Sequence, residues 1–81
     1  MKVEIRGYNP DYPDGKLFGT WTLDEQGRAV CNDSNYQYRF EKVGAVGDHG
    51  HIYYPKDGEP FLRNLPDQYA NSSFFWAEII D

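Results

Sequence analysis

The sequence has few cysteines and histidines and no long apolar run. Its 81 residues include one cysteine, Cys31, and two histidines, His49 and His51. A single cysteine excludes an intrachain disulfide, whereas small secreted domains usually carry several. No apolar stretch approaches the ~20 residues that span a membrane, and residues 1–6 lack the apolar segment of a signal peptide. These absences predict a cytoplasmic protein.

Basic residues are also in the minority. Eight Lys and Arg stand against thirteen Asp and Glu, which gives a net charge of −5. Binding to nucleic acid or to an anionic membrane needs a basic surface, so this balance argues against both kinds of partner. It favours another protein with a basic surface, because opposite charges accelerate encounter.

Aromatic residues, by contrast, are abundant. Seven Tyr, five Phe and two Trp each bring a large apolar surface to a chain that has room for one domain, residues 1–81. A core this small needs most of its large side chains, so a deep catalytic pocket would compete with it. The composition therefore favours a binding protein over an enzyme.

Strand signals dominate the first part of the chain. Residues 2–6 alternate, with Val3 and Ile5 on one face. Residues 8–15 carry Asn-Pro and Pro-Asp-Gly, which predict a loop. Residues 16–23 predict a second strand. One face of this strand carries Leu17, Gly19, Trp21 and Leu23, and the other carries Phe18, Thr20 and Thr22.

A hairpin and an ambiguous segment follow. A loop at residues 24–27, with Gly27 able to take positive φ, predicts a hairpin to a strand at residues 28–32. In residues 33–43, alternation suits a strand, but the capping-box pattern Ser34-x-x-Gln37 and a helical apolar spacing suit a helix. The helix is the preferred interpretation. Three glycines predict a flexible loop over residues 44–51, before a short extended piece at residues 52–54.

The last third predicts a helix and a closing strand. Asp57 is the expected N-cap, Pro60 falls in the first turn, and the apolar face consists of Phe61, Leu62 and Leu65. Residues 73–81 are apolar on both faces, which predicts a central strand beside the N-terminal one. The predicted fold is α+β: a small single-layer antiparallel sheet of four or five strands with one or two short helices packed on one face. An exposed edge strand would allow a homodimer through sheet extension.

Residues 54–66 carry a pattern of their own, and the likeness extends to residue 80. They read P-x-D-G-E-x-F-L-x-x-L-P after Tyr54, followed by a turn of small residues and a terminal strand. This pattern resembles a signature of small, uncharacterised bacterial proteins and covers about a third of the chain. The resemblance implies an α+β fold and no particular chemistry. The segments at residues 8–15 and around His49 and His51 lie outside it.

The best candidates for binding are tyrosines in turn-rich segments. Tyr8 and Tyr12, with Asp11 and Asp14 beside them, would give rigid amphipathic contact area, as would Tyr54. The alternative, which the small size of the core favours, is that Tyr8 and Tyr12 fold back to cover that core. Both tryptophans, Trp21 and Trp76, are predicted to lie in the core.

Chemical sites receive less support. His49 and His51 could hold Zn²⁺, Cu²⁺ or Ni²⁺ in an extended segment, but a closed zinc site needs about four ligands and Cys31 is the sole thiol. Cys31 lies in an alternating strand, and this position favours a buried free thiol over a catalytic nucleophile. The sequence predicts no cofactor.

The residues together predict a small acidic protein-interaction module. Small inhibitors from phages or mobile elements, and immunity-type proteins of bacteria, share this size and charge. The alternative is a small-ligand or metal-binding module that uses the loop with His49 and His51. An enzyme is the least favoured class.

Overall fold

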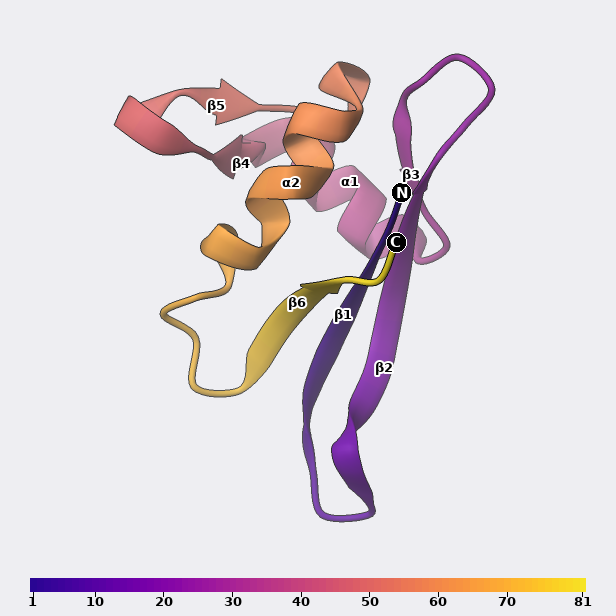
Figure 1. The fold of residues 1–81 in the computed structure, drawn as a ribbon, viewed down its shortest axis with the longest axis vertical. Coiled ribbons are helices and arrows are strands. Elements are labelled where there is room, and N and C mark those ends of the chain that lie inside the picture. Colours follow the sequence, from indigo (N-terminus) through magenta and orange to yellow (C-terminus); the bar gives the residue numbers. More distant parts are fainter.

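The computed structural model describes residues 1–81 as one antiparallel sheet with two helices on one face (Figure 1). The sheet order is β3-β2-β1-β6. Its strands are β1 (Lys2–Asn9), β2 (Tyr12–Leu23), β3 (Ala29–Cys31) and β6 (Phe75–Ile79). The helices are α1 (Ser34–Val43) and α2 (Glu59–Gln68), and neither is long and apolar enough to cross a membrane. The predicted α+β class, with short helices packed on one face of a four-stranded sheet, is confirmed.

A second, smaller sheet lies between the helices in the sequence. It pairs β4 (Ala45–Val46) with β5 (Ile52–Tyr53), and the 3₁₀ turn η1 (Asp48–Gly50) joins the two strands. A further 3₁₀ turn, η2 (Pro55–Asp57), leads into α2. The segment predicted as a flexible glycine loop is therefore partly a short two-stranded ribbon.

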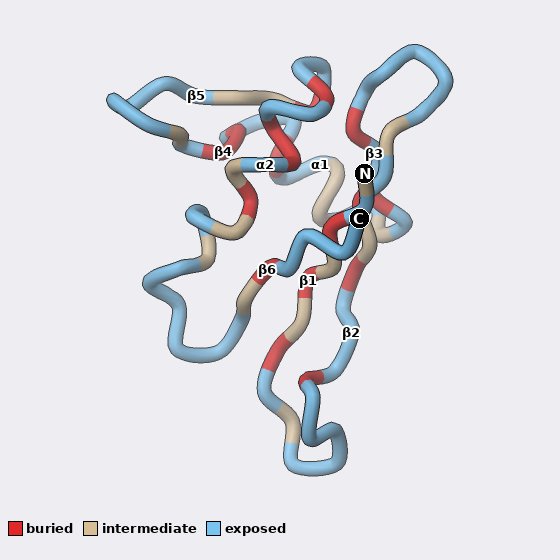
Figure 2. Tube along the Cα trace, viewed as in Figure 1, coloured by how far each residue is buried: buried red, intermediate tan, exposed pale blue.

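The core lies between the helices and the half of the sheet nearest to them (Figure 2). Trp21 of β2 is fully buried, and its indole meets the rings of Phe40 and Phe61 edge-on at centroid distances of 5.8 and 4.9 Å. The predicted apolar face of the second helix and the predicted inward face of the first strand are both confirmed. The buried set is Val3, Ile5, Trp21, Ala29, Cys31, Phe40, Ala45, Phe61, Leu62, Leu65 and Ala77.

The β1–β2 hairpin is longer than its sequence predicts. Residues 8–15 were expected to form a loop, but β1 runs to Asn9, β2 begins at Tyr12, and only Pro10 and Asp11 turn the chain. The Asn9 Oδ1 accepts a hydrogen bond from the Asp11 backbone N–H at 2.9 Å, so the polar residues close a tight turn. The hairpin consequently extends well beyond the helices (Figure 1).

A β-bulge corrects the predicted faces of β2. Gly19 pairs with Ile5, but Leu17 already pairs with the next residue of β1, Arg6, so Phe18 is the extra residue. Leu17 therefore lies on the face away from the helices, and Phe18 lies on the helix face. Simple alternation cannot reveal a bulge, because the inserted residue reverses the pattern for the rest of the strand.

Residues 33–43 form the preferred helix, but with a different N-cap. The Asp33 carboxylate accepts hydrogen bonds from the backbone N–H groups of Asn35 and Tyr36 at 2.9 and 3.2 Å. The predicted cap was Ser34, one residue later. In α2, likewise, Gly58 occupies the N-cap position, and Asp57 instead accepts a 2.7 Å hydrogen bond from the Tyr54 N–H in η2.

The last strand is at an edge of the sheet, which corrects the prediction of a central position. β6 does pair with β1, with Ala77 opposite Ile5, but no strand pairs with its other side. No helix covers the outer face of the sheet, so the apolar residues of β6 on that face do not belong to the core. Trp76 lies on that outer face and is outside the core, contrary to prediction.

Candidate functional site

The hairpin end carries four of the residues singled out in the sequence. Tyr8, Tyr12, Asp11 and Asp14 are all exposed there, at the end of the sheet away from the helices (Figure 1). The Tyr8 side chain is 76% exposed, so the tyrosines do not fold back onto the core, and that expectation is wrong. The restricted φ of Pro10 and the tight turn hold in place the two strands that carry the Tyr8 and Tyr12 rings.

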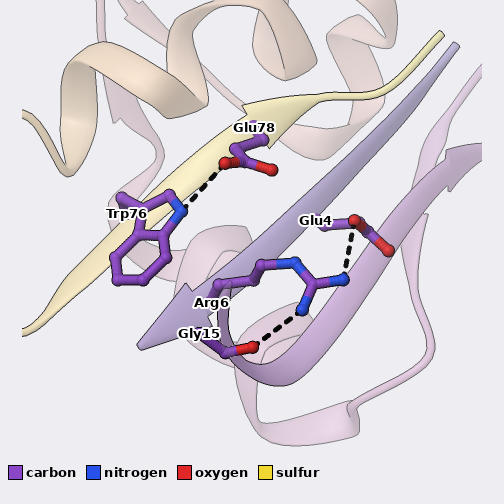
Figure 3. A network of polar contacts seen from close by, with 5 residues as sticks. All are labelled: Glu4, Arg6, Gly15, Trp76 and Glu78. Atoms are coloured by element: carbon purple, nitrogen blue, oxygen red, sulfur yellow. Dashed lines mark hydrogen bonds and ion pairs between the residues drawn. The ribbon is translucent and has the colours of Figure 1, made fainter. Parts of the chain in front are cut away.

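On the outer face, Trp76 reaches from β6 across β1 to β2 (Figure 3). Its ring meets the Tyr8 ring edge-on at 5.2 Å, and its Nε1 donates to Glu78 Oε1 at 3.2 Å. Gly15 sits beneath the indole, with φ of +90°, and a Cβ there would overlap the indole carbons. The glycine therefore permits both the backbone conformation and the close approach of the ring.

The Arg6 side chain of β1 also contacts Gly15, on the outer face beside Trp76. Its Nη1 donates to the Gly15 carbonyl oxygen at 2.9 Å, and its Nη2 pairs with Glu4 Oε1 at 3.1 Å (Figure 3). The Arg6 and Glu4 side chains are only partly exposed, so the ion pair is less screened than a fully solvated one. The bond to Gly15 ties β1 to the irregular segment of β2, and the ion pair with Glu4 orients the Arg6 side chain along β1.

On the helix face, the aromatic residues continue beyond the core. Phe18 and Phe75 meet edge-on at 5.4 Å, and Gly7 lies between them, since a Cβ there would be 2.8 Å from Phe18 and 2.9 Å from Phe75. Phe74 immediately precedes β6 and is 71% exposed. Its carbonyl oxygen accepts a hydrogen bond from the Tyr8 N–H at 3.0 Å.

We call these residues together the distal aromatic surface. They come from the hairpin end and from the start of β6, and all lie outside the core: Tyr8, Tyr12, Leu17, Phe18, Phe74, Phe75 and Trp76. Lys16 lies among them, with its Nζ 5.9 Å from the Tyr12 ring centroid and 5.8 Å from that of Phe18.

Two shallow hollows adjoin the helix side of this surface. One, of about 340 Å³, is lined by Phe18, Asp33, Asn35, Tyr36 and Arg39. The other, of about 280 Å³, is lined by Arg39, Phe40, Gln68, Tyr69, Ser72 and Phe75. Arg39 borders both hollows and forms no salt bridge.

Burial shifts the titration of two tyrosines near these hollows. It raises the pKa of Tyr69 to about 12, with the neighbouring Tyr36 adding to the rise. It also raises the pKa of Tyr36, and the negative charge of Asp33 contributes. Both hydroxyls therefore stay protonated at neutral pH and act as neutral hydrogen-bonding groups.

Cys31 is a buried free thiol, as its strand pattern predicts. Burial raises its pKa, and the charge of Asp33 adds to this, although backbone hydrogen bonds from Asp33, Thr20 and Asn32 oppose the shift. A raised pKa disfavours the thiolate at neutral pH, so Cys31 is a poor nucleophile in this environment.

The remaining candidates lie elsewhere. His49 and His51 are both exposed in the β4–β5 ribbon, where the His51 ring is 4.5 Å from that of Tyr53. No group of three or more His, Cys, Asp or Glu side chains converges anywhere in the chain. Tyr54 is half-buried at the N-cap position of η2, a turn that contacts both helices, and it does not belong to the hairpin end.

Sequence reasoning missed the aromatic partners of the hairpin tyrosines. The run Phe74-Phe75-Trp76 was interpreted as a core strand, and Phe18 was assigned to the wrong face. The bulge and the edge position decide both outcomes, and each depends on pairing with β1. The one local signal is a glycine within each of the two strands, Gly7 and Gly15, because a glycine inside a strand often marks the close approach of another group.

Comparisons with protein-family models, with characterised proteins and with solved structures find no significant match to this chain. The resemblance of residues 54–80 to a bacterial signature therefore stays a prediction.

Proposed function

We propose that the protein is a non-enzymatic interaction module that docks on another protein through the distal aromatic surface. The observation that carries this proposal is the gathering of large exposed side chains at one end of the sheet, outside the core. These side chains lie on both faces of the sheet, with Trp76 on the outer face and Phe18 and Phe75 on the helix face. Exposed apolar groups gathered at one end of a molecule usually mark a binding site. Tyrosine and tryptophan are, moreover, the residues most enriched among binding hot spots.

The rigidity of the surface supports the proposal. Tyr8 is held by the hydrogen bond from its N–H to Phe74 and by contact with Trp76, which is itself fixed over Gly15. Side chains that are ordered before binding lose less conformational entropy on association. A projecting hairpin with fixed aromatic residues can therefore enter a groove of a partner at low cost.

The charge of the surface indicates the kind of partner. Asp11 and Asp14 are exposed beside the tyrosines, and the chain as a whole carries a net charge of −5. A partner with a basic rim around an apolar groove would complement this arrangement. Such a rim would act mainly on the association rate, which would fall as salt is raised. An inhibitor or immunity-type role is one form that this binding could take.

The hairpin end is better supported than the alternative site at His49 and His51. Neither hollow is lined by a histidine, and the two imidazoles have no third ligand beside them. Burial disfavours the thiolate of Cys31 and the phenolates of Tyr36 and Tyr69, which supports a role without nucleophilic catalysis. The exposed groups at the hairpin end are aromatic side chains such as Tyr8 and Tyr12, which suit recognition by contact.

The test compares three tagged proteins in capture from host lysate: wild type, the double variant Tyr8→Ala/Tyr12→Ala, and Tyr38→Ala. Tyr38 is 65% exposed on α1 and serves as a matched control. A true partner should be retained by wild type and Tyr38→Ala and lost, by at least tenfold, with the double variant. Capture that is unaffected by the double variant but lost with Tyr38→Ala would contradict the proposal.

A further inference from the structure

The two edges of the sheet differ in how their backbone groups are covered. At the β3 edge, the Gln37 side chain acts as a substitute strand: its Oε1 accepts from Cys31 N–H at 2.7 Å, and its Nε2 donates to the Ala29 carbonyl at 3.4 Å. β3 is also only three residues long. Short edge strands and covered backbone groups are the usual protections against strand addition.

The β6 edge has little of this protection. The Ile80 N–H donates to Lys2 and the Phe74 carbonyl accepts from Tyr8, so the even-numbered residues of β6 face β1. In an antiparallel ladder the alternate residues then direct their N–H and C=O groups outward, which here are Phe75, Ala77 and Ile79. Only Phe75 N–H has a side-chain partner, Ser72 Oγ at 3.1 Å.

The side chains at this edge include one of the usual deterrents, the exposed carboxylate of Glu78, but lack the others. The strand contains no proline, no lysine and no bulge, and its pairing with β1 is regular from Phe75 to Ile79. Ile79 is 44% exposed although it lies on the helix face, where its neighbours Val3 and Ala77 are buried. An additional strand beside β6 would cover it.

We infer that a second copy of this chain pairs with β6 in antiparallel register centred on Ala77. Because outward groups must face outward groups, the register must be centred on a residue, and the three inner residues of β6 offer Trp76, Ala77 and Glu78 as centres. The Glu78 centre places two like charges directly opposite, which is destabilising. The Trp76 centre pairs three residues of each strand, whereas the Ala77 centre pairs all five from Phe75 to Ile79.

The favoured register is also chemically complementary. Phe75 faces Ile79 of the second copy on the helix face, which is an aromatic–β-branched pair. Trp76 faces Glu78 on the outer face, so its single indole N–H can donate to Glu78 of the second copy in place of Glu78 of its own chain. The product is an eight-stranded sheet with all helices on one face and with the two hairpin ends directed oppositely.

This inference goes beyond the proposed function, because it concerns pairing between copies at Ala77 and Ile79 and leaves the hairpin tyrosines free. Phe75 and Trp76, which belong to the distal aromatic surface, would lie in the paired strand, whereas the two hairpin ends with Tyr8 and Tyr12 would stay uncovered. The two proposals can fail separately, since one is read from partner capture and the other from the mass of the isolated protein.

The test is the oligomeric state of the purified full chain by sedimentation equilibrium from low to high micromolar concentration. Wild type should show twice the chain mass. The substitution Ile79→Lys should raise the dissociation constant of the dimer at least tenfold, so that this variant is mainly monomeric. The matched control is Val30→Lys on the covered β3 edge, where Val30 is 40% exposed; it should dimerise like wild type. Circular dichroism establishes that each variant is folded.

Two further variants keep the inference falsifiable if Ile79→Lys does not fold. Ala77→Pro removes only an outward N–H, so it should abolish dimers without breaking the β1–β6 ladder. Ala77→Cys should form an intermolecular disulfide on mild oxidation, because only this register places position 77 opposite itself within bridging distance. A wild-type monomer throughout, or a dimer that survives Ala77→Pro and Ile79→Lys, would overturn the inference; a monomer would leave the edge to a strand of another protein.

Discussion

At the scale of single residues, two glycines decide where the aromatic rings of the hairpin lie. Gly15 has the positive φ that other residues rarely adopt, and Trp76 occupies the space where its side chain would be. Gly7 leaves room for the contact between Phe18 and Phe75. The aromatic residues were visible in the sequence, but their positions depend on which glycine of a neighbouring strand lies opposite each ring.

Tyr69 gives a pH prediction at this scale. Its pKa is raised to about 12 in the folded protein, whereas tyrosine in an unfolded chain ionises near about 10. The folded state therefore binds the proton more tightly, and this contribution to stability is complete below about pH 10 and is lost as pH rises toward 12. Denaturant unfolding across this range should show the loss.

The substitution Tyr69→Phe isolates this effect. The variant should lose less stability than wild type between pH 10 and 12, because it has no hydroxyl to ionise. Tyr38→Phe alters an exposed tyrosine of α1 and should keep the wild-type dependence. The assignment to Tyr69 would be wrong if Tyr69→Phe and Tyr38→Phe behave identically.

At the scale of elements, the chain's local signals predict most strands and helices but not their exact limits. The hairpin at residues 24–27, the helix in residues 33–43 and the apolar face of α2 all follow from spacing and turn residues. Both N-caps differ from the predicted residue by one position: Asp33 instead of Ser34 in α1, where neighbouring polar residues are both competent caps, and Gly58 instead of Asp57 in α2. Geometry selects Asp33 over Ser34, and sequence alone gives no reason to choose between them.

The N-cap of α1 can be tested directly. Asp33→Ala removes the acceptor for the Asn35 and Tyr36 N–H groups and should lower the free energy of unfolding by about 1 kcal/mol. Ser34→Ala, the matched control, should have a smaller effect, since Ser34 supplies no capping hydrogen bond. Urea denaturation of both variants measures the difference, and an effect confined to Ser34→Ala would refute the assignment.

At the scale of the whole molecule, the sequence predicts the architecture but not the assembled site. Alternation placed Val3, Ile5 and Trp21 in the core correctly, and the α+β class follows from the same patterns. The distal aromatic surface requires the bulge at Phe18 and the edge position of β6, and both are properties of pairing between distant segments. For the same reason, the apolar last strand was interpreted as central when it is exposed on one side.

The two proposed surfaces also belong to this scale. The hairpin end projects beyond the helices, and β6 is the sheet edge without a substitute strand (Figure 1). The hairpin end would recognise a partner through side chains, and the β6 edge would pair through backbone groups. A chain with a small core can thus place exposed aromatic residues on a rigid extension without including them in that core.

The most direct measurement is hydroxyl-radical footprinting of the captured complex against the free protein, read by mass spectrometry of peptides. The expected result is protection of Tyr8, Tyr12 and Phe74 in the complex, with Tyr38 on α1 labelled equally in both states, because docking would cover the hairpin end alone. Protection of Tyr38 with full labelling of Tyr8, Tyr12 and Phe74 would contradict the proposal that the protein binds through the distal aromatic surface.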